Sequence, residues 1–211
     1  VIFAKDDTEK VSAFLVETKS EGFIIEKHLD MMGVRGEDVC PLRLDRVRVP
    51  ASNLLGIPGQ GYKVLLTAIG VGQLGIAAES VGLARGALRM SVDYAKDRTV
   101  KDRPMTELPT IQSLLGEMAA RTEAARWLTY RTADLKDSGQ LTGKDSAIAK
   151  LFASQAANDV VDMALQIHGS YGYSKELEIE RLYRDAKVTQ IYEVVSEVQR
   201  LIVGSSVAHG Q

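Results

Sequence analysis

Cysteine is almost absent from this sequence. Cys40 is the only cysteine in 211 residues, so no disulfide can form within the chain, and we expect a reducing compartment. Histidine is also scarce, with three residues. His168 has no second histidine, cysteine or carboxylate at the spacing of metal ligands. No metal site is therefore expected.

Long apolar runs and an excess of charge of one sign are lacking too. No run approaches the roughly 18 apolar residues that mark a membrane span, so none is expected. The net charge of -2 gives no general electrostatic attraction to nucleic acid. Apolar residues make up 45% of the chain and charged residues 26%, which is typical of a globular protein with a buried core.

The first part of the chain is predicted to be β structure. Short apolar or alternating segments predict strands at residues 1–4, 11–16, 23–25, 42–44 and 47–49. The alternation slips between the last two segments, which predicts a bulge or bend. So few short strands make a thin sheet with little core. The sequence starts inside the first segment, which indicates that the chain is part of a longer protein.

The stretch from Gly56 to Gly61 is the clearest break, because it contains three glycines and a proline. Beyond it the apolar period becomes 3.6, which predicts helices over about 74–95, 111–135, 148–167, 178–188 and 197–207. Long helices favour an antiparallel bundle, with Trp127 in its core. We therefore predict an α+β, mainly α fold, with a partial β-sheet over 1–56 and an antiparallel four-helix bundle over 57–211.

One carboxylate near the C-terminus has an unusual setting. Glu193 lies between an aromatic residue and two valines, three residues before Ser196. The segment from Ser196 to Gln199 fits the capping box Ser-x-x-Gln, with Ser196 as the N-cap. Glu193 is then in the loop that enters a helix, where poor hydration would make the carboxylate a stronger base for a weakly acidic C–H proton. Alternatively, the helix macrodipole merely attracts it.

Several segments occur in an order that is characteristic of one family. They are QIHGSYGY at 166–173, ERLYRDAK at 180–187 and QIYEVVSEVQR at 190–200, preceded by VRVP at 47–50, NLLG at 53–56 and YAKDR at 94–98. Together they resemble the acyl-CoA dehydrogenase family over essentially the whole chain. The resemblance implies that residues 1–56 are the C-terminal part of the middle β domain, which is incomplete here, and that residues 57–211 are the C-terminal four-helix bundle domain.

The resemblance also implies an activity, a cofactor and partners. Family enzymes of fatty acid metabolism oxidise an acyl-CoA thioester to the 2,3-enoyl-CoA, with FAD as the hydride acceptor. Glu193 matches the base that removes the α proton. Electrons usually pass to an electron-transferring flavoprotein or a similar acceptor, and subunits form homodimers or homotetramers through the bundle. A cytoplasmic location, or the mitochondrial matrix in a eukaryote, would fit.

Further residues match positions that contact FAD in the family. Arg98 matches an arginine on the FAD phosphates, which its planar guanidinium suits; alternatively, it is an exposed arginine at a helix C-terminus. A second stretch matches the contact with the adenosine-diphosphate half, typically from a neighbouring subunit: Gln166, Ile167, His168, Gly169 and Ser170. His168 is interpreted as a packing residue within it. Three residues match a loop at a helix N-terminus, where free N–H groups favour anions: Val195, Ser196 and Glu197. Val194 would line the acyl pocket.

Four departures from the family pattern leave other interpretations open. Val194 and Val195 replace the usual Gly-Thr, the aromatic and the glycine after Arg98 are missing, Pro109 replaces a glutamine, and Gln73 replaces an arginine. One alternative is an acyl-CoA dehydrogenase-like protein with impaired FAD binding that serves as a structural or CoA-thioester-binding subunit. Another is a helical oligomerisation module. Since half of the β domain is missing, we expect the isolated chain to bind FAD weakly or not at all and to be inactive.

Overall fold

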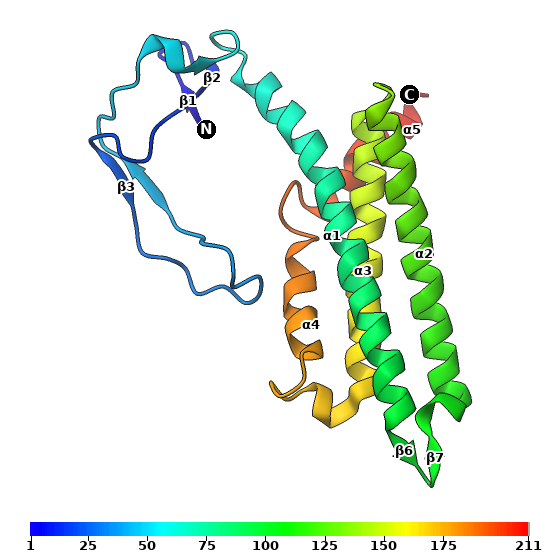
Figure 1. Cartoon of the computed structure of the whole chain (residues 1–211). Coiled ribbons are helices and arrows are strands. Elements are labelled where there is room, and N and C mark those ends of the chain that lie inside the picture. Colours follow the sequence, from blue (N-terminus) through cyan, green and yellow to red (C-terminus); the bar gives the residue numbers. More distant parts are fainter. Residues whose placement is uncertain (211) are drawn as a thin grey trace. The chain divides into compact units, whose positions relative to one another are not determined.

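The computed structural model describes residues 1–210. Contacts between residues divide the chain into two compact units, Val1–Ile69 and the residues from Gly70 onward. The first unit contains strands β1 to β5 and the second contains most of the helical residues. Figure 1 labels β1, β2 and β3 of the first unit and the five α-helices. The predicted α+β, mainly α fold is therefore confirmed.

A three-stranded antiparallel sheet forms in the first unit. It consists of β1 (Ile2–Lys5), β2 (Val11–Phe14) and β5 (Leu54–Leu55), in the order β1-β2-β5. Within these strands, only Ser12 and Ala13 are buried. The prediction of a thin sheet with little core is confirmed.

A separate two-stranded antiparallel ladder pairs β3 (Phe23–Ile25) with β4 (Leu42–Leu44). The predicted bend after β4 is confirmed, because Arg46 has φ 53°, far from the extended conformation. The predicted strand at 47–49 is wrong, since that stretch forms no ladder. Sequence alternation alone does not supply a pairing partner, and β5, which does pair, is too short to show a pattern.

The glycine-rich break lies between β5 and the first helix. The N–H group of Gly59 donates a hydrogen bond to the Ser12 Oγ at 2.8 Å. A Cβ added to Gly61 would lie 2.6 Å from the carbonyl carbon of Ser12. Glycine is needed there because the start of the helix rests directly on strand β2.

The helices occur where the 3.6-residue period predicted them, although their ends extend further. Figure 1 shows α2 and α3 side by side and antiparallel in the second unit. The bounds are α1 (Gly61–Asp97), α2 (Pro109–Asp137), α3 (Gly143–Gly172), α4 (Ile179–Val188) and α5 (Ser196–Ala208), with short 3-10 turns at Ala51–Asn53 and Met105–Glu107. α2 and α5 pack on α3, and α1 contributes Ala84, Ala87 and Ala95 to the core that it shares with α2 and α3. These four helices form the predicted four-helix bundle, and the shorter α4 also packs on α3.

Small side chains dominate the core of the helical unit. Removing them from water drives the packing, and their size lets the helix axes approach closely. The larger of the two buried clusters consists of Ala84, Ala87, Ala95, Ile111, Met118, Ala157, Val160, Val161, Ala164, Ile167, Ile179, Leu182 and Ala186. Trp127 is not among them. The prediction that Trp127 lies in the core is wrong, because its side chain is 63% exposed on α2.

α1 is the one helix among residues 1–210 that meets the length and composition criteria for a membrane span. By length and composition it could cross a membrane, because no charged residue lies between Lys63 and Glu79. Glycine, threonine and glutamine interrupt the apolar runs in this stretch, and so the sequence pattern concealed it. Core helices of soluble proteins meet the same criterion, and α1 places Ala77 and Val81 in a buried cluster.

A hairpin that the sequence did not predict joins α1 to α2. Strands β6 (Thr99–Val100) and β7 (Arg103–Pro104) pair across a two-residue turn. Both turn residues have positive φ, 50° at Lys101 and 62° at Asp102, which is typical of the type I′ turns that close hairpins. Pro109 then occupies the first turn of α2, two residues before the predicted start of that helix.

α3 has a well-defined start and a break near its end. A capping box closes its N-terminus: the Asp145 N–H donates to Thr142 Oγ at 3.2 Å, and the Thr142 N–H donates to the Asp145 carboxylate at 3.3 Å. The Thr142 hydroxyl and the nearby Arg131 lower the pKa of Asp145. Near the other end, Gly169 has φ 60° and ψ -140°, so the helix is interrupted there.

Candidate functional site

The loop between α4 and α5 holds Glu193 in an unusual backbone conformation. Glu193 has φ 49° and Val194 has φ 82°. A β-branched residue resists the left-handed region, and such strain costs about 1–3 kcal/mol. The surrounding structure must therefore stabilise this turn. Strain of this kind is concentrated at functional sites.

The helix that follows begins one residue earlier than predicted. Val195 is the N-cap of α5, with φ -62° and ψ 150°, and no side chain caps the helix. The predicted capping box is wrong, because Ser196 is already helical and its Oγ donates to the Gln190 carbonyl at 3.4 Å. Gln199 points inward instead, and neither its amide nitrogen nor its amide oxygen has a hydrogen-bond partner among residues 1–210. The two left-handed residues shift the start of the helix.

The carboxylate of Glu193 lies against a glycine of α1. A Cβ added to Gly72 would lie 2.5 Å from Oε2 and 2.6 Å from Cδ of Glu193. The Glu193 carboxylate therefore rests on the surface of α1, and the side chain is half-buried. The sequence analysis missed Gly72. A glycine inside a long helix costs about 1 kcal/mol relative to alanine, and that cost is the signal that could have drawn attention to it.

Hydrogen bonds that involve two polar side chains connect the loop to the bundle. The Tyr192 hydroxyl donates a hydrogen bond to the Glu79 carboxylate on α1. On the other side, the Lys150 Nζ on α3 donates to the Val194 carbonyl oxygen at 2.7 Å. The loop is thus held from α1 and α3 on either side of Glu193.

Lys150 is fully buried, which is rare for a lysine. Burial disfavours the ammonium ion and lowers the pKa of Lys150 to about 8, while the negative charges of Glu193 and Glu197 act in the opposite direction. The sequence analysis missed Lys150 too, because it lies next to the apolar stripe of α3. The feature of the sequence that could have drawn attention to Lys150 is a charged residue between the apolar residues Ala149 and Leu151.

The other residues matched to FAD contacts gather at the far end of α3. Arg98 follows α1, and its guanidinium lies 5.4 Å from the ring centroid of Tyr171. His168 is buried: its Nδ1 lies 2.7 Å from the Ala164 carbonyl oxygen, and its ring stacks on Tyr94 at 4.3 Å. Of the remaining matched residues, Ile167 is buried, and those exposed to solvent are Gln166, Gly169 and Ser170.

The matched residues therefore form two separate groups within the helical unit. One contains Glu193 with its following loop and helix start, near Lys150. The other contains Arg98 and the segment around His168. Along α3, 18 residues separate Lys150 from His168, which corresponds to roughly 27 Å at the usual helical rise. The structure does not bring the two groups of this chain together.

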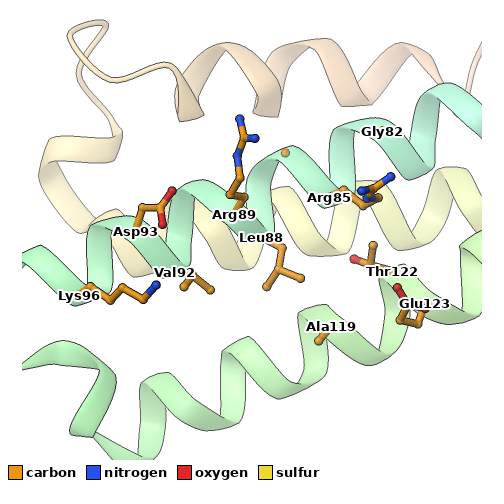
Figure 2. Close-up of a pocket in the computed structure, with 11 residues that line it drawn as sticks. Gly82, Arg85, Leu88, Arg89, Val92, Asp93, Lys96, Ala119, Thr122 and Glu123 are labelled. Carbon is orange, nitrogen blue, oxygen red and sulfur yellow. The ribbon is translucent and has the colours of Figure 1, made fainter.

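A cavity of about 710 Å³ lies between α1 and α2. Figure 2 shows Leu88, Val92 and Lys96 extending from α1 toward the gap that faces Ala119 and Thr122 of α2. None of the residues that line it belongs to the loop around Glu193. Within residues 1–210, no group of three or more histidine, cysteine or acidic side chains could hold a metal ion.

Comparisons with known proteins match this chain along nearly its whole length. Residues 59–208 match the family model for the acyl-CoA dehydrogenase C-terminal domain. The chain is 44% identical over 200 residues to an acyl-CoA dehydrogenase of Bacillus subtilis, and 41% identical over 211 residues to an acryloyl-CoA reductase (NADH) of Anaerotignum propionicum. These matches cover 95% and 98% of this chain but 53% and 54% of the relatives. The chain thus spans about half the length of the curated relatives it matches.

Solved structures agree with these relatives. Butyryl-CoA dehydrogenase from Megasphaera elsdenii superposes with a TM-score of 0.95 at 38% identity, over 98% of this chain and 55% of that chain. An acyl-CoA dehydrogenase complexed with FAD from Bacillus anthracis superposes with a TM-score of 0.95 at 32% identity, over 99% of this chain and 39% of that chain. A chain in a structure of the electron transferring flavoprotein of Acidaminococcus fermentans superposes with a TM-score of 0.95 at 36% identity, over 98% of this chain and 55% of that chain.

Proposed function

This chain belongs to the acyl-CoA dehydrogenase family, and from that premise we propose that the whole natural protein that contains it oxidises an acyl-CoA thioester to the 2,3-enoyl-CoA. The observation on which the proposal rests is the setting of Glu193. Its carboxylate is half-buried, lies against Gly72, and belongs to a strained turn held from two helices. A carboxylate fixed in this way is suited to remove a proton from carbon.

In the proposed reaction, Glu193 takes the α proton of the thioester, and the electrons of that C–H bond form the new α–β double bond. The β hydrogen leaves as a hydride with its two electrons. FAD supplies the acceptor for that hydride. The residues of this chain hold the proton acceptor, and their packing limits the access of water to it.

The residues present fit an FAD molecule in two respects. The N-terminus of α5 has no side-chain cap. The Ser196 N–H donates to the Gln190 carbonyl oxygen at 3.1 Å, and the N–H groups of Glu197 and Val198, which follow it, suit an anion or a carbonyl oxygen. Arg98 is exposed and forms no ion pair within residues 1–210, which suits a phosphate contact. Because the two groups of matched residues are far apart, we propose that they contact different FAD molecules, Arg98 and the segment around His168 meeting the one bound mainly to a neighbouring subunit.

Of the two alternatives, one has specific support. The valines at 194 and 195 remove a glycine and a hydroxyl, which supports an acyl-CoA dehydrogenase-like subunit with impaired FAD binding that binds CoA thioesters or has a structural role. A plain helical oligomerisation module would not require Glu193 or the buried Lys150. The cost of burying an ammonium ion argues against that module.

The reverse direction is a second candidate activity. A relative of 41% identity is an acryloyl-CoA reductase, and the same carboxylate could return a proton to the α carbon while a hydride adds to the β carbon.

We propose an electron-transferring flavoprotein or a similar protein as the redox partner, supported by the match to a chain in the Acidaminococcus structure. We also propose a homodimer or homotetramer, located in the cytoplasm or, in a eukaryote, the mitochondrial matrix.

The proposal can be tested on the whole natural protein. We expect it to purify yellow with bound flavin, and an acyl-CoA added without oxygen should bleach the flavin absorbance. To test the reductive direction, an enoyl-CoA is added to protein that has been reduced with dithionite. A colourless protein that binds acyl-CoA would support the subunit with impaired FAD binding. A protein that binds no acyl-CoA would contradict both and leave the oligomerisation module.

A further inference from the structure

Lys150 makes a contact that the packing of the bundle does not require. It is completely buried on α3, yet its Nζ bonds to a backbone carbonyl in a loop 44 residues further along the chain. Replacing a buried ion by an apolar residue of similar volume is often neutral or even stabilising. Folding stability alone therefore does not account for a lysine at this position.

The bonded carbonyl belongs to the most strained residue of the site. Val194 has φ 82°, and the residue before it, Glu193, also has a positive φ. A peptide group in an unusual orientation needs an interaction that the relaxed conformation would lose. The hydrogen bond from a cation to the Val194 oxygen, 2.7 Å long, is such an interaction.

The charge of Lys150 is directed at the same loop. No carboxylate lies within ion-pair distance of Nζ among residues 1–210, and the anions that influence it are Glu193 and Glu197, on either side of the bonded carbonyl. A moderately distant cation attracts the Glu193 carboxylate toward the bundle without forming the close ion pair that would occupy its oxygens. Both oxygens thus stay available for a proton.

On the basis of the proposed function, we propose that Lys150 is a positioning residue for the base. By donating a hydrogen bond to the Val194 carbonyl oxygen, it holds the turn formed by Glu193 and Val194 in its left-handed conformation. The carboxylate is thereby kept against Gly72 on α1. Lys150 itself does not touch the reacting atoms.

The test compares Lys150→Met with Lys150→Arg in the whole natural protein. Methionine keeps most of the length and removes the charge and the hydrogen-bond donor, whereas arginine keeps the charge and the donor. Lys175→Met is the matched control, because Lys175 is exposed in the loop after α3. For Lys150→Met we expect kcat to fall about 10- to 100-fold, as for a misplaced catalytic group, while KM changes less than about threefold. Lys150→Arg should recover a substantial part of kcat.

Amide deuterium exchange of residues 189–198 gives a second measurement that does not depend on turnover. In Lys150→Met the loop should exchange about tenfold faster, with the core of α3 unchanged. Normal kcat or unchanged exchange in Lys150→Met would overturn the positioning role, as would an equal effect of Lys175→Met. If the unmodified protein does not act on acyl-CoA at all, the proposed function fails, and the exchange measurement still decides whether Lys150 holds the loop.

Discussion

At the scale of single residues, the site depends on backbone features that side-chain chemistry does not reveal. The sequence singled out Glu193 by its setting in an apolar loop and by its match to a family motif. It did not identify Gly72, because the signal of a glycine inside a long helix is shared by other glycines of α1, such as Gly70 and Gly75. Nor did it place the start of α5 correctly, because the capping pattern at Ser196 ignored the two left-handed residues before it. The backbone conformation of the loop before α5 therefore mattered more for the start of this helix than the capping-box pattern did.

Gly72→Ala tests the contact between α1 and the base. The added Cβ would lie 2.5 Å from the Glu193 carboxylate, and the carboxylate, as the flexible end of a side chain, would be displaced. Since a displacement of about 1 Å can cost 100-fold in rate, we expect kcat to fall about 10- to 100-fold. Alanine should leave the helix as stable as before or stabilise it by about 0.5–1 kcal/mol.

Gly75→Ala is the control for this variant, because a Cβ at Gly75 meets no atom within 4 Å. It should keep normal kcat and show a similar change in thermal stability. Steady-state kinetics and thermal unfolding of the whole natural protein measure both effects. Equal kcat values for the two alanine variants would show that the carboxylate does not depend on Gly72.

The burial of Lys150 predicts a pH dependence of stability. The pKa of Lys150 is about 8 in the folded protein and 10.5 for an ordinary lysine. Between these pH values the unfolded chain binds more protons, so this residue makes the free energy of unfolding rise with pH, by up to about 1.4 kcal/mol per pH unit. Below pH 8 both states are protonated, and the contribution is constant.

Urea unfolding of the chain and of Lys150→Met at several pH values isolates this contribution. The difference in free energy of unfolding between the two should be constant below about pH 8 and change between pH 8 and 10.5 in favour of the native lysine. A difference that stays flat across that range would contradict the lowered pKa.

At the scale of elements, periodicity predicted the helices and the segments that form β1 to β4, but it failed for one strand and for the hairpin turn. The long stripes predicted α1, α2 and α3 because each buries a continuous face. The strand predicted at 47–49 is wrong, and the hairpin between β6 and β7 was missed, because pairing depends on a partner segment and on turn conformation rather than on alternation. Trp127 was misplaced since spacing places a residue on a face without showing what covers that face.

The exposed aromatic cluster on α2 predicts a contact between subunits. Trp127 is 63% exposed, its ring meets Tyr130 edge-on at 6.1 Å, and the guanidinium of Arg126 lies 5.2 Å from the Trp127 ring. Tryptophan, tyrosine and arginine are the residues most enriched in interface hot spots. We expect Trp127→Ala to weaken self-association at least about tenfold and Trp127→Phe to weaken it less.

Analytical ultracentrifugation over a range of protein concentrations measures this effect. The helical content from circular dichroism should stay the same in both variants, because Trp127 is outside the core. An unchanged association constant for Trp127→Ala would show that the cluster faces solvent in the assembly.

At the scale of the whole molecule, the two units differ in how much they bury. The helical unit has two buried apolar clusters, whereas the strands of the first unit leave large apolar side chains exposed, among them Ile25, Leu42 and Leu44. The resemblance in the sequence agrees with this imbalance, since it implies that residues 1–56 are only part of the family's β domain. The matched relatives are about twice as long as this chain.

This imbalance predicts weak cofactor binding by the isolated chain of 211 residues. The expected FAD contacts in this chain are limited to the start of α5, Arg98 and the end of α3, which together offer few partners for the flavin ring. We expect gel-filtered chain to retain less than about a tenth of one FAD per subunit, with a dissociation constant above micromolar. Stoichiometric FAD after gel filtration would refute this expectation.

The central claim is that the Glu193 carboxylate removes a proton from the carbon beside a thioester. Its most direct test is the exchange of the α hydrogen of a bound acyl-CoA with D2O, followed by mass spectrometry in the whole natural protein and in Glu193→Gln. The account predicts α-deuterium incorporation by the unmodified protein and its loss, by at least about 100-fold, in Glu193→Gln with thioester binding retained. Equal incorporation by the two proteins would contradict it.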